Sequence, residues 1–134
     1  MQKYNHIKSL LKLTGLQFIE RESAFSSHWK LYNKEMIEVI VAVDIHPEWV
    51  HILCNVGSIN NYMDKVQNHL LRLNNMSAGL KFSLEKNQNI VCSSELWYAT
   101  ISEDHLKQQI TQVVKMVTQF YERIEKENLK LNSA

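Results

Sequence analysis

Apolar residues alternate with other residues along two consecutive stretches, 37–45 and 50–56, which are separated by a turn at His46, Pro47 and Glu48. The alternating set is Ile37, Val39, Val41, Val43 and Ile45 in the first stretch and Val50, Ile52, Cys54 and Val56 in the second. A period of two with many β-branched residues is typical of β-strands. The pattern therefore predicts a β-hairpin with one face that is entirely apolar.

Shorter alternating runs predict further strands. Residues 16–18 form one such run, and residues 29–31 form another after a Ser-rich stretch. Two more runs, at 80–84 and 90–96, are joined by the polar segment 85–89. Because a short polar turn between two strands is typical of a hairpin, we expect the last two runs to pair with each other.

Three stretches repeat their apolar residues every three or four positions, as one face of an α-helix does. The first covers residues 4–11 and can end at Gly15. The second covers 59–73, and its apolar stripe is wide enough for two neighbours, either within one domain or in a second subunit. The third follows Ser102, a suitable N-cap residue, and keeps its stripe as far as Ile124.

The predicted elements follow the order α-β-β-β-β-α-β-β-α. Strands joined by short turns pair antiparallel, and helices then gather mainly on one face of the sheet. The sequence thus predicts an α+β fold in which an antiparallel sheet is flanked by helices. A chain of 134 residues is long enough for one core, so we expect a single domain over 1–134 with a frayed C-terminal tail at 126–134.

Charge and composition narrow the class of function. Fifteen basic and fourteen acidic residues give a formal net charge of +1, and no cluster of Lys and Arg stands out. Nucleic acid and anionic membranes are therefore not expected as partners. The chain contains no run of about 18 apolar residues and no secretory signal pattern, so we expect a cytoplasmic protein.

The sequence contains no arrangement that is typical of a catalytic or cofactor site. The six histidines are scattered and form no zinc-binding motif. Cys54 and Cys92 lie within strand patterns, where a thiol usually serves as a small apolar group and not as a nucleophile or half of a disulfide. The three glycines form no phosphate-binding loop. We therefore predict no catalytic residue, no cofactor, no metal and no enzymatic activity.

The second face of the predicted sheet carries more apolar side chains than a solvated face needs. The side chains that alternation assigns to it include Met36, Ile40, Ala42, Trp49, Leu53, Val91 and Trp97, beside Glu38, Asp44, His51 and Asn55. We predict that Ile40, Trp49, Leu53, Val91 and Trp97 form a protein-binding surface. The alternative is that Trp49 and Trp97 pack under loops or against the first helix and complete the core of a monomer.

The second half of the chain resembles a known family. A helix ending in LLRLNN is followed by GLKFSL, a polar turn, NIVCSSEL and a helix that opens with SEDHL. This arrangement, over roughly residues 59–125, resembles the YbjN family, whose fold is similar to that of type III secretion chaperones. The sequence ELWYAT departs from that family, in which an apolar residue and a proline often follow the glutamate.

The resemblance implies a homodimer that holds partner polypeptides or acts in regulation without catalysis, and it offers no catalytic residues. We therefore predict a non-catalytic protein-binding module, chaperone-like or a regulatory adaptor, with a protein partner of unknown identity. An alternative from another class is a small-molecule sensor or enzyme that uses a cleft between sheet and helices. A nucleic-acid regulator would need a basic stripe, which the sequence lacks.

Overall fold

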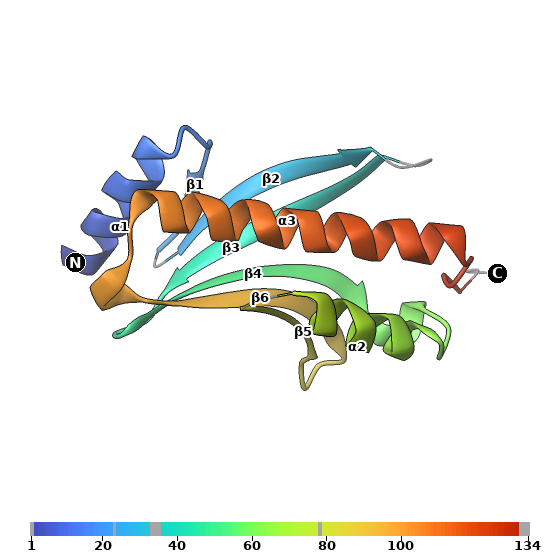
Figure 1. The fold of residues 1–134 in the computed structure, drawn as a ribbon. Coiled ribbons are helices and arrows are strands. Elements are labelled where there is room, and N and C mark those ends of the chain that lie inside the picture. Colours follow the sequence, from blue (N-terminus) through green and yellow to red (C-terminus); the bar gives the residue numbers. More distant parts are fainter. Residues whose placement is uncertain (1, 23, 33–35, 78, 132–134) are drawn as a thin grey trace.

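The computed structural model describes residues 2–22, 24–32, 36–77 and 79–131 (Figure 1). The elements in chain order are α1 (Gln2–Leu13), β1 (Ile19–Glu20), β2 (Ala24–Tyr32), β3 (Met36–Ile45), β4 (Trp49–Ser58), α2 (Val66–Met76), β5 (Leu80–Leu84), β6 (Asn89–Trp97) and α3 (Glu103–Lys126). This confirms the predicted order of helices and strands and the α+β class.

The six strands form one sheet in the order β1-β2-β3-β4-β6-β5, and all neighbouring strands are antiparallel. Both predicted hairpins, β3–β4 and β5–β6, are present. The helix α2 separates them in the chain, and β6 returns to pair with β4. As a result β5 lies at one edge of the sheet, and β1 with β2 lies at the other.

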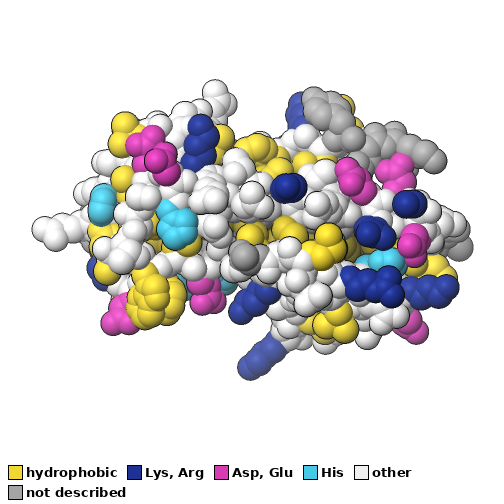
Figure 2. All heavy atoms as spheres, in the orientation of Figure 1, with side chains coloured by type: hydrophobic (Ala, Val, Ile, Leu, Met, Phe, Trp, Pro, Cys, Tyr) yellow, Lys and Arg dark blue, Asp and Glu magenta, His cyan; other side chains and the backbone are white. Residues whose placement is uncertain are grey.

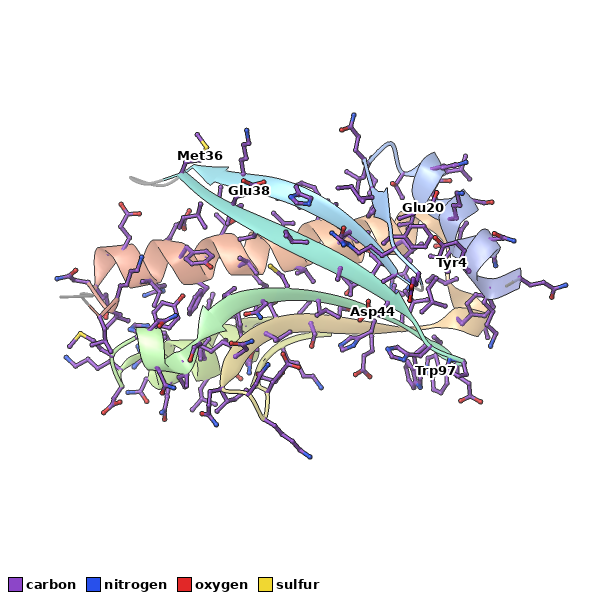
Figure 3. All side chains as sticks on the ribbon, turned by 180° about the vertical axis from the view of Figure 1, so that it is seen from behind. Tyr4, Glu20, Met36, Glu38, Asp44 and Trp97 are labelled. Carbon is purple, nitrogen blue, oxygen red and sulfur yellow. The ribbon has the colours of Figure 1, made fainter. Side chains whose placement is uncertain are left out.

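All three helices lie on one side of the sheet (Figure 1). The long helix α3 packs against β3, β4 and β6, while α2 contacts β5 and α1 contacts α3. The helix α3 begins where the sequence predicts, because the Ser102 hydroxyl accepts a hydrogen bond from the backbone N–H of His105 at 3.2 Å. Seen from behind, the strands lie in front of α3 (Figure 3).

The core fills the space between the helices and the sheet. Inward residues of the central hairpin are at most 4% exposed; they are Val39, Val41, Val43, Val50, Ile52, Cys54 and Val56. Phe120 of α3 is fully buried, and its ring centroid lies 5.4 Å from that of Tyr62 and 5.5 Å from that of Phe82. The alternation in the sequence therefore assigned the two faces of this hairpin correctly.

The predicted helix over 59–73 is wrong in its first part. A 3-10 turn at Ile59–Asn61 follows β4, and α2 starts only at Val66. Between them, the Tyr62 hydroxyl donates a hydrogen bond to the carbonyl of Val56 at 2.7 Å, and the backbone at Tyr62 is extended. Tyr62 is buried and Ile59 packs against the core, but Met63 is 44% exposed. The backbone N–H of Met63 donates to the carbonyl of Leu129, so the segment does not continue a helix.

Two strand predictions also need correction. The run 16–18 forms no strand; β1 begins immediately after it, at Ile19. The strand β2 starts at Ala24, so part of the Ser-rich stretch belongs to the sheet. Leu16 and Phe18 nevertheless pack against the core from the connecting segment. Alternate side chains of this connecting segment are thus partly buried, and such a loop produces the same alternating pattern as a strand.

The prediction that 126–134 frays is wrong for the described part of the tail, residues 126–131. The tail carbonyl of Leu129 accepts a hydrogen bond from the N–H of Met63 at 2.7 Å, and the N–H of Leu131 donates to the carbonyl of Asn61 at 2.9 Å. Leu129 is 2% exposed and belongs to the core. Residues 127–131 are therefore held in place, while 132–134 lie outside the described residues.

We expect Leu129→Ala to lower the free energy of unfolding by about 2–5 kcal/mol, because the change removes buried apolar volume and leaves a cavity. Leu131→Ala is the matched control, since the Leu131 side chain is 49% exposed. It should change the free energy of unfolding by less than about 0.5 kcal/mol. Urea unfolding of both variants measures the difference, and equal small effects would show that the tail does not stabilise the core.

Candidate protein-binding surface on the open sheet face

The five residues that were predicted to bind protein lie on the face of the sheet opposite the helices. Its side chains form cross-strand rows set by the register: Trp49 with Trp97; Asp44 with His51 and Glu95; Ala42 with Ser26, Leu53 and Ser93; and Asn55 with Val91. In Figure 3, Trp97 lies beyond one end of β3, near Asp44, and Met36 with Glu38 lies at the other end. No described helix packs across these rows.

Trp49 and Trp97 form what we call the tryptophan patch. Their ring centroids are 3.7 Å apart with an interplanar angle of 28°, so the indoles are stacked. Trp97 is 53% exposed, and neither indole belongs to the main core cluster. The two rings thus pack on each other and not on the core, in contrast to the monomeric alternative. Stacking of this kind contributes about 0.5–1.5 kcal/mol beyond area burial.

Ile40, Leu53 and Val91 form a second group, which we call the central patch. Ile40 is 49% exposed and Leu53 is half-buried, but Val91 is only 4% exposed. Val91 can therefore support the surface but offers almost no contact area of its own. The row of His51 and its two carboxylate neighbours lies between the central patch and the tryptophan patch. The structure brings the five predicted residues onto one face as two patches.

Charges of both signs surround these patches. His28 Nδ1 lies 3.3 Å from Glu38 Oε1, and both side chains are largely exposed. His51 lies between Asp44 and Glu95 in the register. A surface with mixed charge and an exposed indole is typical of protein contacts and lacks the uniform positive charge that a polyanion requires.

A hollow of about 280 Å³ lies on the opposite side of the molecule, between α2 and α3. The residues that line it are Leu73, Met76, Gln119, Glu122, Arg123 and Lys126. This hollow was not predicted from the sequence, although four of its lining residues follow the helical spacing of a single face of α3: Gln119, Glu122, Arg123 and Lys126. Figure 2 shows Lys and Arg side chains, interspersed with Asp and Glu side chains, over this part of the molecule.

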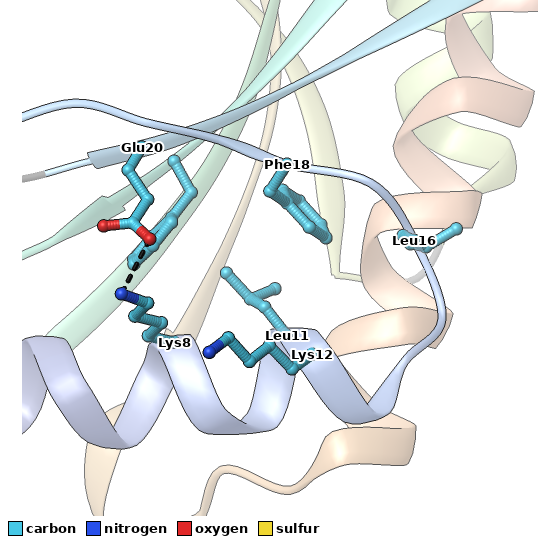
Figure 4. A pocket seen from close by; sticks show the side chains of 7 residues that line it. Lys8, Leu11, Lys12, Leu16, Phe18 and Glu20 are labelled. Carbon is cyan, nitrogen blue, oxygen red and sulfur yellow. Dashed lines mark ion pairs between the residues drawn. The ribbon is translucent and has the colours of Figure 1, made fainter.

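A smaller pocket of about 90 Å³ lies between α1 and the segment that leads into β1 (Figure 4). Leu11, Phe18 and other apolar side chains line it, and Lys8 Nζ contacts Glu20 Oε1 at 2.7 Å across it. Hydrogen bonds from Lys8 and Tyr4 lower the pKa of the Glu20 carboxyl group. This pair links α1 to β1, and we assign it a structural role.

The described residues offer no metal site, because no group of three or more His, Cys, Asp or Glu side chains is close enough to hold an ion. In the same part of the chain, no helix combines the length and the apolar character that crossing a membrane requires.

A family model described as "Putative bacterial sensory transduction regulator", YbjN, matches residues 5–126. The chain belongs to the YbjN family. The predicted resemblance is thereby confirmed, and the match extends well into the strand-rich first half of the chain. No curated protein is significantly similar to this YbjN-family protein in sequence.

Solved structures share the fold of this YbjN-family protein. YbjN from E. coli superposes with a TM-score of 0.65 at 15% identity, covering 96% of this chain and 95% of the other. ExsC, solved in complex with ExsE, gives 0.62 at 13% identity, covering 90% and 94%. The Yersinia pestis type III secretion chaperone SycH, in complex with a stable fragment of YscM2, gives 0.55 at 20% identity, covering 87% and 98%. The chaperone-like fold is confirmed.

The two cysteines of this YbjN-family protein face each other across β4 and β6. Cys54 and Cys92 are partners in the register, and both are fully buried with free thiols. Burial raises the pKa of each thiol to about 12, and at Cys92 the nearby Cys54 adds to the effect. Since the thiolate is the nucleophilic form, neither thiol is activated near neutral pH.

We therefore expect iodoacetamide at pH 8 to leave Cys54 and Cys92 of the native protein unmodified, because pH 8 lies far below a thiol pKa of about 12. In urea both thiols should react, and mass spectrometry counts the added groups. Ser83→Cys provides the control, since residue 83 is exposed on β5 and a thiol there should react in the folded protein. Rapid modification of the native wild type would contradict the prediction.

Proposed function

We propose that this protein is a non-catalytic protein-binding module, chaperone-like or a regulatory adaptor, that forms a homodimer and holds a partner polypeptide. The observation that carries the proposal is the open sheet face, on which exposed Trp97 stacks on half-buried Trp49 beside the central patch. Tryptophan is enriched among the residues that dominate binding energy at protein interfaces. An apolar surface rimmed by charged residues is also the usual anatomy of such an interface.

A second copy of the chain is the occupant that we propose for this face. In a two-fold contact the same surface meets itself, so its charges must be compatible with their own copies. The face carries His28 and Lys30 on β2 and Glu38, Asp44 and Glu95 on β3 and β6. Antiparallel packing of two such faces can place basic side chains of one subunit near acidic side chains of the other.

Two relatives support the proposal that a partner polypeptide is held. ExsC was solved with ExsE, and SycH was solved with a fragment of YscM2. Each is a protein of this fold in a complex with another polypeptide. The proposal assigns no catalytic role to the two cysteines, because burial raises the pKa of each thiol to about 12.

A small-molecule sensor or enzyme that uses a cleft between sheet and helices is the alternative. Such a site would need a concave space with convergent titratable groups. In the described part of the chain, buried apolar side chains from α3 and the central strands occupy the space between helix and sheet. This packing favours the binding module.

We expect the wild type to sediment as a dimer and the double variant Ile40→Glu, Trp97→Glu to sediment as a monomer. Each substitution places a carboxylate in the proposed contact, and the dimer dissociation constant should rise by at least about thirtyfold. Sedimentation velocity over a concentration series measures this change, and circular dichroism verifies that the variant is folded.

The matched control is Leu13→Glu, because Leu13 is 64% exposed at the end of α1 and lies away from the sheet face. It introduces the same chemical group and should leave the dimer intact. A wild type that is monomeric at all concentrations, or a folded double variant that remains dimeric, would overturn the proposed homodimer.

A further inference from the structure

The hollow between α2 and α3 has an apolar floor and a charged rim. Leu73 of α2 is 4% exposed and forms part of the floor, while Met76, one turn later, is 70% exposed at the rim. A methionine side chain is flexible and polarisable, so it can adapt to differently shaped apolar groups. The hollow can therefore accept an apolar side chain.

Two cations at the rim, Arg123 and Lys126, form no ion pair within the described part of the chain, whereas Lys8 is paired with Glu20. Glu122 is the one carboxylate among the lining residues, so two cations face one anion. Basic residues near a helix C-terminus interact favourably with the helix dipole, but this does not explain why they flank a hollow.

A further cation extends this positive rim along α2. Arg72 lies four residues before Met76 and thus on the same side of the helix. On the same helix, His69 Nε2 lies 2.9 Å from Glu127 Oε2, which ties α2 to the end of α3. This contact uses the carboxylate of Glu127 and leaves the neighbouring cations free to meet an external anion.

The shape of the hollow favours a peptide over a small molecule. A small ligand is usually enclosed over most of its surface, whereas this hollow lies between two helices with an exposed methionine at its rim. Nucleic acid would need a longer basic stripe than these three cations provide. An extended or helical segment with acidic and apolar residues fits both the charge and the floor.

We propose that this hollow holds an acidic segment of the partner polypeptide, with an apolar side chain against Leu73 and Met76 and carboxylates on Arg123 and Lys126. The inference rests on the proposed function and names the site and the chemistry of the partner. Because the hollow is on the helical side and the proposed dimer contact is on the open sheet face, both can be occupied at once (Figures 1 and 3).

Fluorescence anisotropy with a short fluorescein-labelled peptide in which Glu and Leu alternate tests the proposal. We expect the wild type to bind this peptide, and affinity should fall as salt concentration rises because the cations are exposed. A peptide with Lys in place of Glu should not bind, and one with Ser in place of Leu should bind more weakly. The variant Arg123→Glu, Lys126→Glu should weaken binding by at least about tenfold.

The control variant Lys86→Glu, Lys107→Glu changes the net charge equally at exposed positions away from the hollow, and it should bind like the wild type. Equal affinity of the Arg123→Glu, Lys126→Glu variant and the wild type would overturn the proposal. Displacement of the peptide by citrate, together with undiminished binding of the Ser-containing peptide, would also overturn it by identifying a site for small anions.

Sedimentation of the same samples separates this proposal from the proposed function. The Arg123→Glu, Lys126→Glu variant should remain a dimer. The Ile40→Glu, Trp97→Glu variant should become a monomer that still binds the Glu-containing peptide. If the dimer behaves as expected but Arg123→Glu, Lys126→Glu binds the peptide like the wild type, the hollow is not the partner site. If the peptide binds as expected but Ile40→Glu, Trp97→Glu remains a dimer, the sheet face is not the dimer contact.

Discussion

The sheet has two faces, and the described helices cover only one of them. Both helices that follow a strand lie on the same side of the sheet: β4 leads through the 3-10 turn at Ile59–Asn61 towards α2, and β6 leads through a second 3-10 turn, at Tyr98–Thr100, into α3. With α1 also packed on α3, the described helices leave the second face without a cover. Since that face retains exposed apolar residues, the arrangement of helices creates the proposed binding surface.

Elements with a strong local pattern could be predicted from the sequence, and those that depend on distant contacts could not. The hairpin β3–β4 and the helix α3 follow directly from periods of two and 3.6. The segment 59–65 also has a helical pattern, but its backbone at Met63 bonds to Leu129. No local period signals a pairing between residues so far apart in sequence, so both the late start of α2 and the fixed tail were missed.

The face that carries the candidate surface could be predicted from the sequence, but the arrangement of residues within that face could not, because it depends on contacts between strands. Alternation assigns each side chain to a face, and it placed Ile40 and Trp97 on the open one. The rows within that face depend on the register between strands, which alternation alone does not give. The register sets His51 and its carboxylate neighbours between the two patches. The hollow between α2 and α3 depends on the relative position of two helices, which the sequence pattern leaves undetermined.

A core of this kind requires an apolar pattern and a suitable volume, and many sequences satisfy both conditions. Relatives with low identity can therefore keep the fold while their exposed residues diverge. Partner choice, in contrast, depends on those exposed residues, because binding energy concentrates in a few side chains at the surface. The proposed partner must therefore be inferred from the indoles of this protein and from Arg123 and Lys126, which form no ion pair within the described residues. The fold shared with secretion chaperones supplies only the framework that positions these side chains.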